Sequence, residues 1–225
     1  MKKEYLSIIK TTVSEILDSI PDGVKLVAAA KTRLPDEVKA AIEAGVKIIG
    51  YNYIQEAERM RPAIDDPVQW HMIGHLQRNK VRNAVKLFDM IETIDSLKLA
   101  EAVNKHCVSE GKIMPVLIEI NSGKESNKTG VLPENAESLI KQISSLSNLR
   151  VQGIMTMGPR FGNPEDARPY FKRTRSLFEQ LKKSETPSVE MLYLSMGMSN
   201  SYKIAIEEGA NIVRIGTLLF GERCS

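Results

Sequence analysis

The stretch EMLYLSMGMSNSYKIAIEEGANIVRIGTLLFGERC, residues 190–224, contains two apolar runs separated by a helical segment over 199–208. The first run, 191–196, ends in small residues, and the second, 212–215, is followed directly by Gly216-Thr217. Free backbone amides and hydroxyls at two neighbouring strand ends can surround an anion without a bulky side chain in the way. In a parallel barrel, the loops after the seventh and eighth strands often form such a phosphate site.

The rest of the chain repeats the same alternation of apolar runs and helical segments. Apolar positions at helical spacing predict a leading helix over residues 1–19. Further strands are predicted at 24–30, 48–52, 70–74, 90–94, 115–120 and 151–157. Helices are predicted at 35–44, 54–61, 76–86, 96–108, 133–145 and 164–183. This order predicts an α/β fold, a single (β/α)8 TIM-type barrel with a leading N-terminal helix, and residues 1–225 as one domain.

A doubly wound open sheet is the alternative architecture for alternating strands and helices. Such a sheet usually carries a glycine-rich fingerprint after its first strand. This chain has Lys31-Thr32-Arg33-Leu34-Pro35 there, and no linker or long repeat divides it. The barrel is therefore favoured.

Composition excludes several classes of function. A net charge of +3 is too small to indicate a nucleic-acid partner. Cys107 and Cys224 do not form a disulfide framework, and Cys107 continues the apolar stripe of its helix. The three histidines lack metal-ligand spacing, so no metal is expected. The N-terminus has no apolar run typical of a signal peptide or membrane span, which predicts a cytoplasmic protein without a membrane partner.

Lys31 and Arg214 are basic residues at or within strands that are otherwise apolar. Lys31 ends the run VKLVAAAKTR (24–33), where three alanines leave space beside it. Desolvation favours the neutral amine that an imine requires, so Lys31 facing a phosphate site suggests a phosphorylated aldehyde held as an imine. Arg214 lies within IVRIG on the same strand face as residues 212 and 216. It could serve the site, or it could form a buried ion pair with a strand-end acid.

Polar or small residues end most of the predicted strands, among them Asn52, Ser195, Gly216 and Thr217. In a barrel, the carboxyl ends of the strands form the functional face. Strand ends also become polar simply because they meet water, and for any single residue that reading remains open.

Six segments resemble the YggS/PROSC family of pyridoxal phosphate homeostasis proteins, in the family's order. They are AAAKTR (28–33), GYNYIQE (50–56), WHMIGHLQRNK (70–80), VLIEINSGKESNKTG (116–130), VQGIMTMGP (151–159) and LSMGMSNSYKIAIEEGANIVRIGTLLFG (194–221). That family is similar to the barrel domain of alanine racemase, a fold-type III pyridoxal-phosphate barrel. The resemblance implies pyridoxal 5'-phosphate (PLP) as the cofactor.

The resemblance also implies roles for particular residues. Lys31 would form the internal aldimine, and Arg214 would face the pyridine nitrogen. Ser195, Gly216 and Thr217 would bind the phosphate, and Asn52 would lie beside the ring. The family usually has GENY where this chain has Gly50-Tyr51-Asn52-Tyr53, which puts a role for the glutamate position in doubt.

Three functions follow from these observations, and the resemblance favours the first. It is a PLP carrier in intracellular PLP homeostasis, monomeric, with apo PLP-dependent enzymes as possible recipients and no catalytic residue of its own. The second is a PLP-dependent amino-acid racemase or related enzyme. The chain ends soon after Thr217, so we expect no second domain to complete such a site. A Schiff-base aldolase of phosphorylated sugars is the third, and no specific motif supports it.

Overall fold

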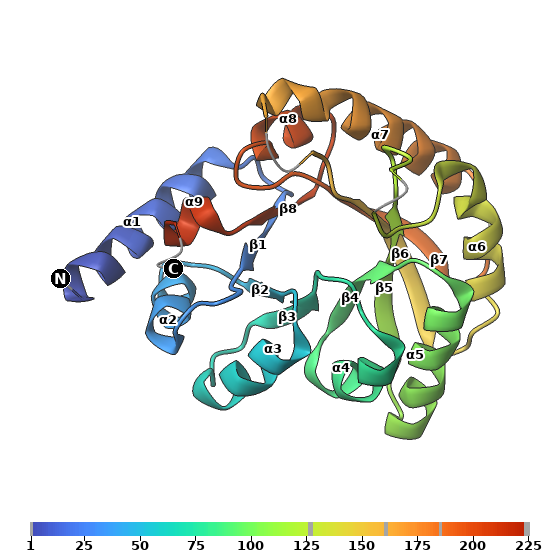
Figure 1. Ribbon diagram of the computed structural model, residues 1–225, viewed down its shortest axis with the longest axis horizontal. Helices are drawn as coiled ribbons and strands as arrows, with labels where there is room; N and C mark the ends of the chain where they lie inside the picture. Colours follow the sequence, from blue (N-terminus) through green and yellow to red (C-terminus); the bar gives the residue numbers. More distant parts are fainter. Residues whose placement is uncertain (1, 126–127, 160–161, 185, 223–225) are drawn as a thin grey trace.

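In the computed structural model, which describes residues 2–125, 128–159, 162–184 and 186–222, eight parallel strands close into a barrel in sequence order (Figure 1). Strand β8 pairs with β1, with Leu26 opposite Val213 and Val27 opposite Arg214, and this pairing closes the barrel. The predicted barrel is thus confirmed, and the open sheet is wrong. The strands are β1 (Lys25–Ala29), β2 (Ile48–Tyr51), β3 (Gln69–Met72), β4 (Met90–Ile94), β5 (Met114–Ile120), β6 (Leu149–Thr156), β7 (Val189–Ser195) and β8 (Ile212–Ile215).

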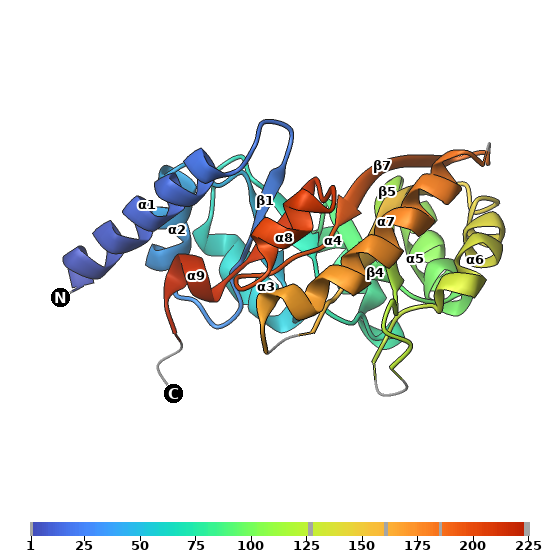
Figure 2. The same ribbon diagram turned by 90° about the horizontal axis from the view of Figure 1, so that it is seen from above.

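Helices surround the barrel, and α1 lies beside α2 and α9 in both views (Figures 1 and 2). Short 3-10 turns precede several of them, so α4, α6 and α7 begin later than the sequence pattern predicts. The sequence did not predict α9, because a single turn is too short to show helical periodicity. The helices are α1 (Lys2–Ser19), α2 (Pro35–Glu43), α3 (Ile54–Met60), α4 (Val81–Leu87), α5 (Leu97–Glu110), α6 (Ala136–Ile143), α7 (Arg168–Lys182), α8 (Tyr202–Glu207) and α9 (Thr217–Phe220).

Successive residues of each strand face either the surrounding helices or the barrel interior, and both sides contain an apolar cluster. Outward-facing side chains pack against the helices, whose buried faces include Cys107 of α5, as predicted. Cys224 lies outside the described residues. Inward-facing apolar side chains form a smaller cluster, namely Val27, Ile48, Ile73, Met90, Leu117, Met155 and Ile212. Polar side chains on the same inward alternation, such as Glu92 and Arg214, are also buried, so they must find partners inside the barrel.

No helix in the described ranges is both long and apolar enough to cross a membrane.

Candidate functional site

A pocket of about 440 Å³ opens at the carboxyl ends of the strands, and we call it the barrel-mouth pocket. Its volume is in the range of small-molecule sites. Lys31, Asn52 and Arg214 line it together, as the sequence predicts for residues at strand ends. The full lining is Ala29, Lys31, Asn52, Tyr53, Ile73, Glu119, Ile120, Asn121, Lys128, Thr129, Met157, Gly158, Met198 and Arg214.

A larger surface groove, of about 780 Å³, lies beside α6 and α7. Lys124 and Glu134 in its lining already pair with each other at 3.1 Å. The barrel-mouth pocket is the better candidate, because it combines an amine, a guanidinium and a carboxyl in one concave site.

Lys31 lies in a tight turn directly after β1. The next residue, Thr32, has a φ of 64°, a conformation that β-branched residues rarely adopt. Such a strained residue persists only where the surrounding structure holds it. The Ala30 amide donates to the Gly50 carbonyl (3.0 Å), and the Arg33 amide donates to the Ala30 carbonyl (3.2 Å), so both sides of the turn are tied down.

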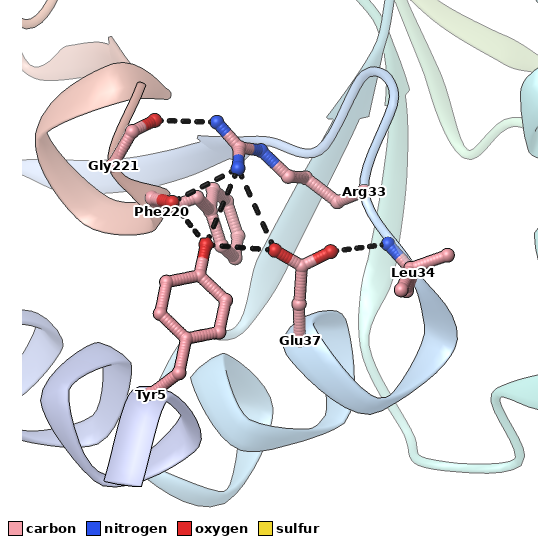
Figure 3. A network of polar contacts seen from close by, with 6 residues as sticks. All are labelled: Tyr5, Arg33, Leu34, Glu37, Phe220 and Gly221. Atoms are coloured by element: carbon pink, nitrogen blue, oxygen red, sulfur yellow. Dashed lines mark hydrogen bonds and ion pairs between the residues drawn. The ribbon is translucent and has the colours of Figure 1, made fainter. Parts of the chain in front are cut away.

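Arg33 connects the Lys31 turn to the end of α9 (Figure 3). Its guanidinium donates to the carbonyls of Phe220 (2.9 Å) and Gly221 (2.5 Å). The Tyr5 hydroxyl of α1 lies within hydrogen-bond distance of the Phe220 carbonyl (2.6 Å) and of Glu37 (2.9 Å). The turn with Lys31 and the one-turn helix that begins at Thr217 are therefore held in one network, which favours a preorganised site.

Arg214 lies in β8, and its side chain is buried. One of its amino groups donates to the Ser195 hydroxyl (2.5 Å), and the other donates to the Thr156 carbonyl (2.8 Å). The Ser195 hydroxyl in turn donates to the carboxylate of Glu92 (2.6 Å), which lies 3.9 Å from Arg214. The buried ion pair considered for Arg214 is thus present, and Arg214 also lines the pocket.

Glu92 balances the charge of Arg214. Burial alone would raise the pKa of Glu92, but the hydrogen bond from His71 Nδ1 (2.7 Å) and the charge of Arg214 outweigh it, with help from Ser195. The pKa of Glu92 therefore lies below its ordinary value of 4.5, and the carboxylate is ionised at neutral pH. An ionised carboxylate only accepts hydrogen bonds, so His71 donates from Nδ1. We call Glu92, His71, Ser195 and Arg214 the arginine network.

Ser195 and Ser199 have different surroundings. Ser195 is the last residue of β7, fully buried, and its hydroxyl belongs to the arginine network. Ser199, in the loop after β7, accepts hydrogen bonds from the amides of Gly216 (3.2 Å) and Leu218 (3.3 Å). Two amides of the turn after β8 thus converge on one oxygen. The Ser195 hydroxyl is thus bonded within the arginine network, and Ser199 is the serine that contacts the predicted phosphate turn.

The predicted phosphate turn lies next to the pocket. A Cβ atom at Gly216 would come within 3.1 Å of the Ala29 carbonyl, and Ala29 lines the pocket. Thr217 is exposed and begins α9. The structure therefore brings Gly216 close to the strand that Lys31 follows, as the sequence predicts.

Tyr51 occupies the position where the family usually has glutamate. Its side chain is buried toward the helices, where its ring stacks on Trp70 with centroids 5.6 Å apart. Burial, with the nearby charge of Glu56, raises the pKa of the Tyr51 hydroxyl. Asn52, the next residue, lines the pocket, so the exchange at position 51 changes the outer packing and not the pocket lining.

Sequence reasoning missed Glu119, Lys128, Thr129, Met198 and Ser199. Glu119 could have been found, because it is an acid within the apolar run VLIEI, just as Arg214 is a base within IVRIG. The other four lie in loops, where no periodicity shows which way a side chain points.

Comparisons with known proteins place this chain among relatives of one kind. Residues 6–224 match the family described as "Alanine racemase, N-terminal domain". The chain is 42% identical over 200 residues to the pyridoxal phosphate homeostasis protein of Aquifex aeolicus, covering 88% of this chain and 87% of that protein.

Solved structures of PipY from Synechococcus elongatus are also similar. The structure without PLP has a TM-score of 0.89 at 30% identity, and the one described as having PLP bound has a TM-score of 0.87 at 29% identity. Each comparison covers 95% of this chain and 100% of PipY.

Proposed function

Because this chain belongs to the family of pyridoxal phosphate homeostasis proteins, we propose that it holds pyridoxal 5'-phosphate in the barrel-mouth pocket as an intracellular carrier. The observation that carries the proposal is that Lys31 and Arg214 line one pocket, with converging amides in the adjacent turn after β8. Three further statements stay predictions: residues 1–225 act as one domain, the protein is monomeric, and it is cytoplasmic.

The side chains fit this cofactor. Lys31 supplies an amine on a fixed turn, and Arg214 supplies a buried guanidinium. The Ser199 hydroxyl, which accepts from the Gly216 and Leu218 amides, keeps its own O–H to donate to a phosphate oxygen at the same turn. Asn52 would lie beside the ring, and Thr217 would add a hydroxyl at the phosphate. When bound, the cofactor supplies an aldehyde carbon with which a lysine amine condenses.

Arg214 supports a carrier rather than an enzyme. Burial lowers the pKa of Arg214 and the charges of Glu92 and Glu119 oppose this, and arginine does not give up a proton in proteins. A pyridine nitrogen beside it stays unprotonated, so the bound ring is a poor electron sink. The relative from Aquifex aeolicus is also named as a homeostasis protein rather than as an enzyme.

Transfer of the cofactor without turnover tests this function. The loaded protein is incubated either with single L-amino acids or with an apo PLP-dependent enzyme. We expect no racemised or decarboxylated amino acid by chiral chromatography, and we expect recovery of activity in the apo enzyme. Racemisation at enzyme-like rates that is lost in Lys31→Ala would overturn the carrier function and support the racemase instead.

Discrimination between phosphorylated and unphosphorylated vitamers tests the phosphate turn. In Ser199→Ala combined with Thr217→Val, pyridoxal phosphate should bind much more weakly, while pyridoxal should be unaffected. A hydrogen bond to a charged group contributes about 1.5–3 kcal/mol, so each lost bond should weaken binding about tenfold or more. Ser195→Ala is the matched control: it should affect both vitamers equally, because Ser195 contacts Arg214. Equal losses in the double variant would refute the assignment.

A further inference from the structure

Glu119, near the end of β5, is a buried carboxyl group in the wall of the barrel-mouth pocket. Its side chain is 4% exposed, and its Oε1 accepts a hydrogen bond from the Thr129 hydroxyl (2.7 Å). Among the described residues, Oε2 has no hydrogen-bond partner. A buried polar atom without a partner is costly, and it is rare unless a ligand or a function accounts for it.

The backbone holds this carboxyl group in place. The Val131 amide donates to the Glu119 carbonyl (2.8 Å), and the Asn121 amide donates to the Val131 carbonyl (2.9 Å). The chain after β5 therefore folds back onto the strand end and places Thr129 against the carboxyl group. Because strand and returning chain are joined by these bonds, the position of Glu119 is fixed before any ligand binds.

The basic side chains near Glu119 have other hydrogen-bond or ion-pair partners. Arg214 is already bonded to Ser195 and Thr156 and lies near Glu92. Lys128 lines the pocket but pairs with Glu125 (2.6 Å). Glu119 Oε2 is thus left without a hydrogen bond although basic side chains lie nearby.

The surroundings of Glu119 shift its pKa in opposite directions, and burial has the largest effect. Burial raises its pKa above the ordinary value of 4.5, and the bond from Thr129 opposes this. Asp95 raises the pKa further, whereas the charges of Arg214 and His75 lower it. Groups that transfer protons efficiently have a pKa shifted toward the working pH.

We propose that Glu119 transfers protons when a small primary amine displaces Lys31 from the cofactor. This inference rests on the proposed function, and it assigns to Glu119 the step by which the cofactor leaves the protein. The geometry behind it is the unpartnered Oε2 in a wall of the pocket that Lys31 also lines.

Each proton and bond in this exchange is accounted for. The incoming ammonium gives one proton to the Glu119 carboxylate and becomes a neutral amine. The amine nitrogen forms the C=N bond to the cofactor carbon, its two remaining protons pass to Lys31 Nζ, and the bond from that carbon to Nζ breaks. Glu119 then gives its proton to Lys31, which leaves as the ammonium. No oxidant or reductant is needed.

Two displacing reagents separate proton transfer from simple damage to the pocket. Glycine is almost entirely an ammonium at pH 7 and needs a base, whereas hydroxylamine is already neutral. In Glu119→Gln, release by glycine should slow about 100-fold, in the range typical of general acid–base catalysis, while release by hydroxylamine should be unchanged. Stopped-flow absorbance of the bound cofactor measures both rates, and Glu119→Asp should restore part of the glycine rate.

Further measurements make the outcome decisive. In Glu119→Gln, the equilibrium affinity for the cofactor should stay within a few-fold of wild type. Infrared difference spectra of the wild-type apo protein should show a carboxyl band that titrates above the ordinary pH range of a glutamate. The same band should be absent in Glu119→Gln. Equal slowing with both reagents, no slowing with glycine, or a band in the ordinary range would overturn the proposal. A wild-type protein that never binds the cofactor at Lys31 would instead overturn the proposed function.

Discussion

Replacing Lys31 by alanine is expected to abolish covalent capture of pyridoxal phosphate. Lys31 is held on a strained turn in the pocket wall, and no other residue of that turn carries an amine. Wild-type protein should be yellow when loaded, and borohydride should fix the cofactor to one peptide. Lys31→Ala should be colourless after dialysis, with no label by mass spectrometry.

Two other lysines provide the controls for this result. Lys128 lines the same pocket, and Lys80 lines a neighbouring one that shares Asn52 and Tyr53 with it. Lys128→Ala and Lys80→Ala should keep the label on Lys31. A label on Lys128 or Lys80 in the wild-type protein would show that the lysine assignment is wrong.

Removing the charge of Glu92 is expected to destabilise the protein strongly. Glu92→Gln leaves the Arg214 guanidinium buried without its counter-charge, and breaking a buried pair from one side typically costs about 3–5 kcal/mol. Urea unfolding at pH 7 should show this loss as a lower midpoint with an unchanged slope. Glu134→Gln removes one partner of an exposed ion pair with Lys124 and should have little effect.

The effect of Glu92 should depend on pH with a definite sign. The folded protein lowers the pKa of Glu92 below its ordinary value of 4.5, so ionised Glu92 stabilises the fold fully above that value. The contribution is lost as the pH falls through the folded-state pKa. The difference in unfolding free energy between wild type and Glu92→Gln should therefore be constant near neutrality and shrink in acid. A difference that is absent at pH 7 would show that Glu92 does not balance Arg214.

A double-mutant cycle measures how strongly the pair is coupled. Glu92→Leu combined with Arg214→Met should be less destabilising than the sum of the single changes, because neither buried charge is then left alone. The double variant should still lose affinity for the cofactor, because Arg214 lines the pocket. Additive losses of stability would mean that the two side chains act independently.

The sequence determined the barrel, and it determined Lys31 and Arg214 as pocket residues. Alternating strand and helix periodicity is a local property, and eight such units leave few other ways to bury the strands. The rule that functional residues gather at the carboxyl ends of barrel strands then selects Lys31 and Asn52. Alternation along β8 is sufficient to turn Arg214 inward.

Only the tertiary structure decided which polar residues meet. Periodicity assigns Ser195 to a strand face but does not reveal its neighbours, and its partner Glu92 is 103 residues away in the chain. The structure also brings Ser199 to the Gly216 amide and folds Thr129 back onto Glu119. These contacts join loops and strand ends whose distances are set by barrel closure. The order of residues along the chain contains no information on such distances. Ser199 at the turn after β8 and Glu119 in the pocket wall could therefore be identified only from the three-dimensional structure.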